Sequence, residues 1–409
     1  MEVAHERCCG LDVHKRIVVA CLLTPGTRGQ PAREVRSFST MTGGLLELAD
    51  WLGAAGCTHV AMESTGSFWK PIYNILEDSF TLLLVNAQHL KAVPGRKTDV
   101  KDAEWIADLL RHGLLHPSFI PDRPGRELRE LTRYRTSLIR ERASEVNRIQ
   151  KVLEGANIKL ASVATNVVGV SGRAMLEAMV AGNEDPQSLA DLAQGKLRGK
   201  REALEEALAG QLGPHQRFLL GVQLRHLDDL DASITVVNQE IQGRLSPFAE
   251  AAQRLTTIPG IGPRTAQVIL SEVGSDVTRF PTGAHLASWA GVCPGNRESA
   301  GKRQSGRTRK GSPWLRSALV QAAHAASHTR TYLAARYRRL AARRGARRAA
   351  MAVAHTILLI AHHLLKYGTV YQDLGANYYD QHDQPRVQQR LVRRLEALGY
   401  AVSLTPTPA

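Results

Sequence analysis

The chain has 409 residues, of which 43% are hydrophobic, and this length is enough for two or three domains with buried cores. Lysine and arginine number 53 against 38 acidic residues, so the formal charge of +15 favours a polyanionic partner, first of all nucleic acid. The five cysteines have no Cys-x-x-Cys spacing, which argues against a disulfide framework or a zinc site, and no apolar run reaches the roughly 20 residues of a membrane helix. With no signal-peptide core at the start, we expect a cytoplasmic, nucleoid-associated protein that makes no contact with a membrane.

The first 120 residues alternate between strand and helix patterns. Residues 7–13 and 17–23 are apolar around a polar bend and predict a hairpin, and a third strand is expected over 33–38. Thr42 is expected to N-cap an amphipathic helix that ends near residue 53. The patterns that follow are a strand over 59–62, a helix over 68–76, a strand over 81–85 and a helix over 99–110. This order fits an α/β domain of the ribonuclease-H-like (RuvC-like) type, in which acids on the first and a later strand meet a closing helix.

Four carboxylates stand where such a domain would bring acids together. Asp12 and Glu63 each follow a buried-strand pattern, and a carboxylate at the end of a core strand is costly to desolvate without a ligand or partner. Asp99 and Asp102 are three residues apart, so a helix places both on one face, where the helix dipole and a divalent cation would offset their repulsion. For this pair alone, a solvated helix start is the alternative. Together, the four predict one site for two hard cations about 4 Å apart.

The middle of the chain has the pattern of long helices. Apolar residues recur every three or four positions over 128–153 and again over 220–245, with arginine and glutamate on the other faces. These helices can pair antiparallel within one chain or form a coiled coil between chains, and the sequence does not choose. The intervening segment, 161–213, is helix-prone.

Glycine and arginine mark the last part of the chain. Residues 258–266 indicate a helix-hairpin-helix-like element whose backbone amides can approach a DNA phosphate, with a plain αα-hairpin as an equal alternative. Residues 297–316 contain seven basic residues, one acid and four glycine or proline breaks, and are expected to form a loop. Residues 330–348 contain eight arginines and no acid, and some of these are expected to contact DNA or RNA without sequence preference. An apolar core helix over 351–365 and a short basic helix over 386–398 complete the chain.

Five short motifs carry a resemblance to a known family. The motifs are Gly10-Leu11-Asp12-Val13-His14-Lys15, Met62-Glu63-Ser64-Thr65-Gly66, Lys97-Thr98-Asp99-Val100-Lys101-Asp102-Ala103, Ile258-Pro259-Gly260-Ile261-Gly262, and Glu298-Ser299-Ala300-Gly301 running on to Arg309-Lys310-Gly311. Taken in this order, they resemble the Piv/MooV-type insertion-sequence transposases, which have a DEDD, RuvC-like domain.

The resemblance implies a site-specific DNA recombinase that moves its own element, guided by a structured RNA, the bridge RNA. It implies that Asp12, Glu63, Asp99 and Asp102 hold Mg²⁺, with two ions expected and Mn²⁺ as a possible substitute. A serine of the terminal domain would attack the DNA backbone to give a phosphoserine link, and this serine maps onto Ser299. The usual Ser-Gly pair reads Ser299-Ala300-Gly301 here, while Ser305-Gly306 is a literal match; the spacing to the flanking motifs favours Ser299.

The predicted architecture has four parts: a RuvC-like DEDD catalytic domain over 1–122, a helical or coiled-coil arm over 123–250, a mainly helical terminal transposase domain with the serine loop over 251–380, and a tail over 381–409. The expected partners are DNA (element ends and target), a guide RNA and further copies of the chain, as a dimer or tetramer. The expected phosphate contacts are Lys97, Arg303, Arg307, Arg309, Lys310 and Arg316. Two other functions stay open: a RuvC-like nuclease that hydrolyses branched DNA with water, and a nonenzymatic nucleic-acid scaffold.

Overall fold

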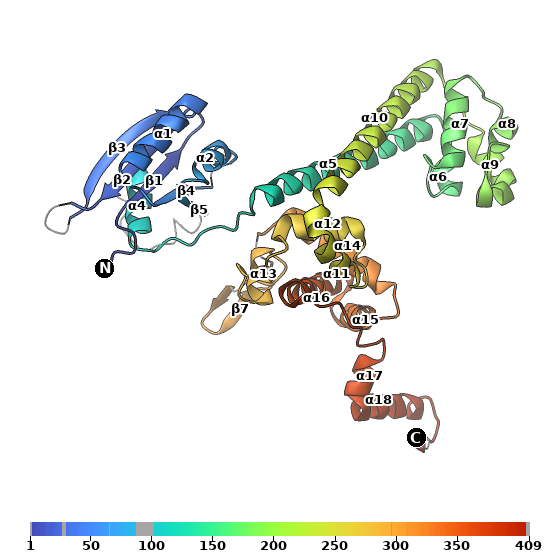
Figure 1. Cartoon of the computed structure of the whole chain (residues 1–409). Helices are drawn as coiled ribbons and strands as arrows, with labels where there is room; N and C mark the ends of the chain where they lie inside the picture. Colours follow the sequence, from blue (N-terminus) through green and yellow to red (C-terminus); the bar gives the residue numbers. More distant parts are fainter. Residues whose placement is uncertain are drawn as a thin grey trace. The chain divides into compact units, whose positions relative to one another are not determined.

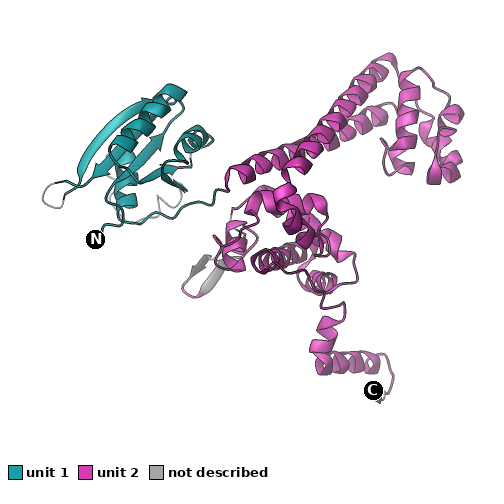
Figure 2. Cartoon of the chain, viewed as in Figure 1, with its two compact units in different colours: residues 1–120 teal, residues 121–409 magenta. Residues whose placement is uncertain are grey.

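A computed structural model describes residues 2–26, 30–64, 66–86, 102–295, 297–308 and 310–405, and for residues 297–299 and 302–305 it describes the backbone only. The chain forms two compact units, residues 1–120 and 121–409 (Figure 2). Lys97, Asp99 and Arg309 lie outside the described residues.

The first unit contains a mixed five-stranded sheet with the strand order β3-β2-β1-β4-β5. The strands are β1 (Cys8–Val13), β2 (Ile17–Thr24), β3 (Ala32–Ser39), β4 (His59–Glu63) and β5 (Thr81–Val85). Strands β1, β2 and β3 pair antiparallel, whereas β4 pairs parallel to both β1 and β5. The predicted hairpin, the third strand and both later strands are therefore confirmed, within one or two residues at each end.

Helices cover both faces of this sheet (Figure 1). Helices α1 (Thr42–Ala54) and α2 (Trp69–Leu76) pack on the face to which Cys9, Leu11 and Val13 point, while α4 (Asp102–Arg111) packs on the other face against Cys8 and Ala61. The predicted N-cap of α1 is wrong by one residue, because Met41 holds that position and its amide donates to the Ser39 hydroxyl, 3.2 Å away. Alternation along β1 thus divides the strand between two cores, and its even-numbered residues face α4.

In the second unit, two long helices pair antiparallel within the chain. They are α5 (Arg123–Gly155), which begins at the N-cap Asp122 with a proline in its first turn, and α10 (Pro214–Arg244). Arg135 of α5 contacts Asn238 of α10, and the later Arg142 of α5 contacts the earlier Asp231 of α10, so the two helices run in opposite directions. The predicted long helices are confirmed, and of the two arrangements left open this chain adopts the intrachain hairpin.

Four short α-helices and one 3₁₀ helix lie between α5 and α10 in the chain and form a cap (Figure 1). Leu160, Met175 and Leu204 of the cap share one hydrophobic core with Leu153 of α5 and Leu224 of α10. The cap consists of α6 (Leu160–Val163), α7 (Val170–Val180), α8 (Pro186–Ala190), the 3₁₀ helix η2 (Gly195–Lys200) and α9 (Arg201–Leu208).

After α10 the chain forms a helical bundle. Its elements are the 3₁₀ helix η3 (Ser246–Phe248), α11 (Ala249–Thr256), α12 (Pro263–Val273), α13 (Gly283–Trp289), the hairpin β6 (Arg297–Ser299) and β7 (Lys302–Ser305), α14 (Pro313–Ser327), α15 (Tyr332–Arg344) and α16 (Ala346–Tyr367). Among the helices that the structure describes, α16 alone is long and apolar enough to cross a membrane, but half of its most apolar stretch is buried inside the protein, as in a core helix. Helix α16 contacts α13, α14 and α15, so it is the central core helix of the bundle, as its sequence predicts. The tail contains α17 (Tyr378–His382) and α18 (Gln384–Glu396), and α18 is the predicted short basic helix.

The turn between α11 and α12 is packed against α14. Gly260 has φ of +89°, and a Cβ atom at this position would lie 2.3 Å from the carbonyl oxygen of Ala322. Ile258 and Ile261 on either side are buried. These observations explain Gly260 by helix packing, as in a plain αα-hairpin. A Cβ atom at Gly262, in contrast, would meet no atom within 4 Å, so the backbone there stays open to a contact from outside.

Candidate active site

Two of the predicted acids lie on neighbouring parallel strands. The register pairs Leu11 of β1 with Met62 of β4, so the next residues, Asp12 and Glu63, stand side by side at the carboxyl ends of the two strands. Both residues are half-buried. The Nε2 atom of His14 lies 3.0 Å from the Asp12 carboxylate. The strand pairing therefore brings these two carboxylates to one edge of the sheet.

Close contact between β1 and α4 places a third acid at the same edge. A Cβ atom on Gly10 would lie 2.3 Å from the carbonyl oxygen of Ala103 and 2.4 Å from the amide nitrogen of Ala107, so only glycine lets the helix come this near. Gly10 and Asp12 share the sheet face that α4 covers, and Asp102 is the first residue of α4, directly before Ala103. The start of α4 therefore lies near the end of β1 that carries Asp12.

Two further acids of α4 serve a structural role. Arg33 of β3 donates to Glu104 at 2.6 Å and to Asp108 at 3.1 Å. These ion pairs tie the helix to the edge of the sheet, which leaves Asp102 as the acid of α4 at the strand ends.

The structure brings three of the four acids to one edge without closing them into a cluster. Within residues 2–26, 30–64, 66–86 and 102–120, and in the described remainder of the chain, no three His, Cys, Asp or Glu side chains are arranged closely enough to hold a metal ion. The fourth acid, Asp99, lies outside the described residues. The carboxylate oxygens at this edge are the type of ligand that a hard cation such as Mg²⁺ prefers. The softer ligands nearby, the buried thiols of Cys8 and Cys21, belong to the hydrophobic core.

The predicted basic loop is in part a β-hairpin, and here the sequence prediction is wrong. Strand β6 pairs antiparallel with β7, and the turn between them consists of Ala300 with φ of +51° and Gly301 with φ of +73°. Two consecutive positive φ angles characterise the tight turn that fits the twist of a hairpin, and glycine adopts them without strain. Ala300 adopts a conformation that glycine favours, so a Ser-Ala-Gly sequence forms the turn at some cost in strain.

The hairpin separates the two candidate serines. Ser299 pairs with Lys302 directly beside the turn, whereas Ser305 pairs with Arg297 at the open end. At about 3.3 Å per residue, the two backbone positions differ by roughly the length of a three-residue strand, near 10 Å. Ser299 therefore lies at the tip of the hairpin and Ser305 at its base.

Four of the expected phosphate contacts lie on this hairpin or follow it in the chain. Arg303 lies on β7, Arg307 and Lys310 are exposed after it, and Arg316 is half-buried in the second turn of α14. The amide of Gly295 donates to the carbonyl oxygen of Arg307 at 2.8 Å, which closes the base of the segment.

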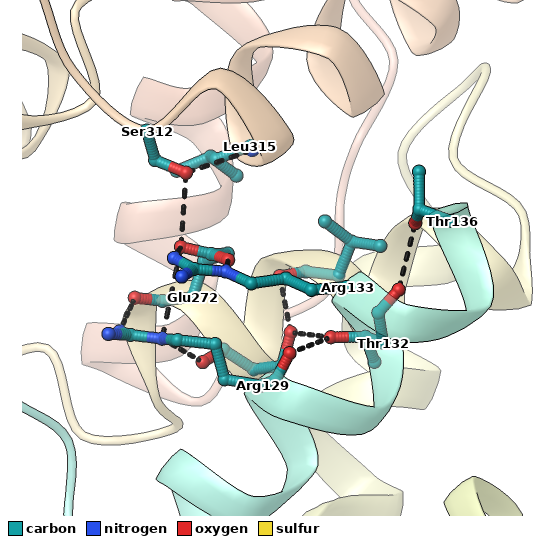
Figure 3. A network of polar contacts seen from close by, with 9 residues as sticks. Arg129, Thr132, Arg133, Thr136, Glu272, Ser312 and Leu315 are labelled. Carbon is teal, nitrogen blue, oxygen red and sulfur yellow. Dashed lines mark hydrogen bonds and ion pairs between the residues drawn. The ribbon is translucent and has the colours of Figure 1, made fainter. Parts of the chain in front are cut away.

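A buried ion-pair network fixes the end of this basic segment to the arm (Figure 3). Arg133 of α5 donates to both carboxylate oxygens of Glu272 on α12, at 2.7 and 2.9 Å, and the Glu272 side chain is only 1% exposed. The hydroxyl of Ser312, the N-cap residue of α14, donates to the same carboxylate at 3.0 Å. Arg129 donates to the backbone carbonyls of Ser271 and Glu272, and burial lowers the pKa of its guanidinium to about 10.

Sequence reasoning missed this network. Glu272 stands in an apolar helix, and its partner Arg133 lies 139 residues earlier in the chain. An acid inside an apolar run is the one local signal that it needs a partner.

The chain is similar to known insertion-sequence transposases. Residues 9–158 match an IS110-type DEDD transposase profile, and residues 252–338 match the profile described as "Transposase IS116/IS110/IS902 family". The chain is 42% identical over 76 residues to an uncharacterized protein of insertion element IS110 from Streptomyces coelicolor, which covers 17% of this chain and 18% of that protein. It is 24% identical over 274 residues to the transposase of IS1111A from Coxiella burnetii, covering 66% of this chain and 65% of the relative. It is also 24% identical over 330 residues to the pilin gene-inverting protein of Moraxella lacunata, covering 77% of this chain and 81% of that protein. The chain thus covers less than two thirds of the length of the first of these relatives.

Proposed function

Because the chain belongs to the IS110 family of transposases, we propose that it is a DNA transposase and site-specific recombinase that cuts and exchanges strands at the ends of an insertion element. The observation that carries the proposal is the placement of Asp12, Glu63 and Asp102 at one edge of the β1–β4–α4 layer. A set of acids at strand ends and a helix start suits phosphoryl transfer on DNA, and neither a plain scaffold nor a core requires it.

We assign the cation site to Asp12, Glu63, Asp99 and Asp102. Bound there, Mg²⁺, with two ions expected and Mn²⁺ as a substitute, would supply charge neutralisation for the attacking and leaving oxygens of the phosphodiester. The four carboxylates would hold the cations, whose positive charge would offset the repulsion between these acids and the DNA phosphates. Lys97, Arg303, Arg307, Arg309, Lys310 and Arg316 would contact the neighbouring phosphates.

We assign the nucleophile to Ser299. Its Oγ would form a bond to phosphorus while the phosphorus–oxygen bond to one deoxyribose breaks, and the leaving oxygen would take up a proton as a hydroxyl. The phosphoserine link conserves the energy of the phosphodiester, so the exchange is reversible. Support comes from the spacing of Ser299 to the flanking motifs and from its backbone position beside the turn at the hairpin tip, whereas Ser305 lies at the base.

Three further assignments follow the resemblance. A structured bridge RNA would select donor and target, a dimer or tetramer would hold the two DNA partners, and the terminal domain over 251–380 would carry the serine for the catalytic domain over 1–122. Because α5 and α10 already pair within the chain, self-association would use their outward faces, on which Tyr134 and Val236 are exposed. Light scattering with and without nucleic acid measures this assembly.

The experiment is detection of a covalent protein–DNA adduct on DNA that carries the element ends. Ser299→Ala is expected to keep the fold and DNA binding and to abolish both adduct and strand exchange, whereas the matched variant Ser305→Ala keeps them. Asp102→Asn should abolish both through weaker cation binding. Cleavage without an adduct would instead favour the alternative, a RuvC-like nuclease that uses water, and an adduct at Ser305 would reassign the nucleophile.

A further inference from the structure

A strongly basic groove lies between α15 and the tail helices α17 and α18. It has a volume of about 990 Å³, and six arginines line it: Arg338, Arg339, Arg343, Arg386, Arg390 and Arg393. Against them stand two acids, Asp380 and Asp383. Most of the lining residues follow residue 338, where the second family match ends. None of these arginines is among the phosphate contacts assigned above.

Most of the positive charge in the groove is not neutralised. Arg386 lies 3.9 Å from Asp383, and Arg339 lies over the ring of Tyr379 at 4.9 Å. The side chains of the other four arginines make no hydrogen bond or ion pair with any residue that the structure describes. Charges that share a groove of this size lie within about one Debye length, roughly 8–10 Å, of a neighbour and repel each other. An anionic ligand would remove this repulsion.

The groove is built by specific contacts between α15 and the tail. Tyr332 at the start of α15 stacks on Tyr379 of α17, with ring centroids 5.7 Å apart, and its amide donates to the Asp373 carboxylate at 3.1 Å. Arg336 donates to the Tyr379 hydroxyl at 3.1 Å. These contacts hold α17, and with it the start of α18, next to the arginines of α15.

The spacing of the arginines indicates the shape of the ligand. Arg386, Arg390 and Arg393 follow one another at intervals of four and three residues, so they form a row along one face of α18 about 10 Å long. Arg339 and Arg343, four residues apart, form a shorter row on α15. Two rows of planar guanidinium forks suit a ligand with a regular series of phosphates, because each fork can donate two hydrogen bonds to one phosphate.

We propose that the groove between α15 and α18 binds the phosphodiester backbone of a nucleic-acid duplex. DNA and RNA share this backbone, and the groove contacts it in a sequence-independent way. The inference extends the proposed recombinase function but does not depend on its chemistry, since binding is measured separately from cleavage and from the Ser299 adduct.

The test compares two triple variants of the full-length chain that remove the same charge. The groove variant carries Arg386→Gln, Arg390→Gln and Arg393→Gln, and α18 contains no buried residue whose packing this would disturb. The control variant carries Arg344→Gln, Arg347→Gln and Arg348→Gln, three exposed arginines of α15 and α16 that do not line the groove. Fluorescence anisotropy measures the affinity of each for a DNA duplex and for an RNA hairpin over a range of salt concentrations, and circular dichroism checks the fold.

The groove variant should bind at least about tenfold more weakly than the control, and the slope of log K against log salt should be shallower by about 0.9 for each phosphate that it no longer neutralises. A larger decrease for DNA or for RNA identifies which duplex the groove holds. Equal decreases in both variants would overturn the proposal in favour of unspecific charge. A groove variant that binds both duplexes normally, or that fails only to bind poly-glutamate, would overturn it in favour of an acidic protein partner.

Discussion

Arg133 and Glu272 form a bidentate ion pair between α5 and α12, and the same carboxylate accepts a hydrogen bond from the N-cap residue of α14. One buried side chain therefore connects the arm, the bundle and the end of the basic segment that carries Ser299. The arm and that segment are expected to keep a fixed relation within the second unit, because a bidentate pair constrains both direction and distance.

Glu272→Ala should destabilise the protein by about 3 kcal/mol, since it leaves Arg129, whose side chain is only 15% exposed, without its carboxylate partner. The value lies at the lower end for broken buried pairs because the Arg133 side chain is 38% exposed and solvent can replace part of the interaction. Chemical denaturation measures the decrease in stability. Glu250→Ala is the matched control: its carboxylate pairs with Arg254 but is 85% exposed, so a change below about 0.5 kcal/mol is expected. Similar decreases in both variants would contradict a special role for the buried pair.

Gly10→Ala should destabilise the first unit by about 1–3 kcal/mol, because the new Cβ would meet the backbone of Ala103 and Ala107. The displaced α4 would also move Asp102 away from Asp12, so DNA cleavage should fall further than the decrease in folded protein explains. Gly53→Ala is the control. Gly53 is exposed in α1 with no atom within 4 Å of a new Cβ, so alanine should stabilise the helix by about 0.5–1 kcal/mol. A Gly10→Ala protein of unchanged melting temperature would show that α4 does not pack as described.

Ala300→Gly should stabilise the hairpin tip by up to about 1 kcal/mol, since glycine adopts a φ of +51° without the strain that a Cβ causes. Gly301→Ala is the reverse change at the adjacent position, where φ is +73°, and should cost about 1–2 kcal/mol. Amide hydrogen exchange of the hairpin measures both. If Gly301→Ala protects the hairpin amides better than Ala300→Gly does, the turn has a different geometry.

The thiols should differ sharply in reactivity. Burial raises the pKa of Cys8 to about 12 and those of Cys21 and Cys57 to about 11, and it raises the pKa of Cys9 well above its usual value. At pH 8 the thiolate fractions are then roughly one in a thousand or less, so a disulfide reagent should titrate the half-buried Cys293 alone and all five thiols after unfolding. Unfolded thiols ionise near pH 9 and the folded ones near 11 to 12, so the unfolded state loses protons first. The buried, protonated thiols therefore stabilise the folded state fully below about pH 9, and this contribution to the free energy of unfolding should be lost as the pH rises through 11. Rapid titration of two or more native thiols would contradict this burial.

Mixing variants tests where the proposed serine acts. Chains with Ser299→Ala keep the four acids, and chains with Asp102→Asn keep the serine. If a serine joins the acids of a neighbouring chain, the mixture should recover part of the strand exchange that each variant lacks alone. If each chain uses its own serine and acids, the mixture should remain inactive while Ser299→Ala and Asp102→Asn stay inactive separately.

Much of the first unit could be predicted because its signals are local. Largely apolar runs of five to eight residues between turns mark β1, β2, β4 and β5. The carboxylates at the ends of two of them, Asp12 and Glu63, lie at neighbouring strand ends once β1 and β4 pair in parallel. The distance between those strand ends and Asp102 could not be predicted, because it depends on how closely α4 approaches Gly10.

The hairpin and the buried network could not be predicted for different reasons. Strands β6 and β7 have three and four residues, too few for an alternating pattern, and their turn uses an alanine in a conformation that its propensity disfavours. The partners of Glu272 come from segments 40 and 139 residues away, and local periodicity carries no information about such pairing.

The chain leaves α5 to form the cap and returns to α10 at a neighbouring point, because the amide of Gln211 donates to the carbonyl oxygen of Ala156 at 3.0 Å. The segment between these residues shares its hydrophobic core with Ile149 and Leu153 of α5 and with Leu220, Leu224 and Leu227 of α10. A short turn could therefore replace the cap once these five side chains are made polar, and a foreign domain with closely spaced termini could be grafted at the same place. Such a graft would sit at the end of a helix about 50 Å long, remote from the bundle that α12 joins, and would give an attachment point for a fluorophore or an affinity module that leaves both units intact.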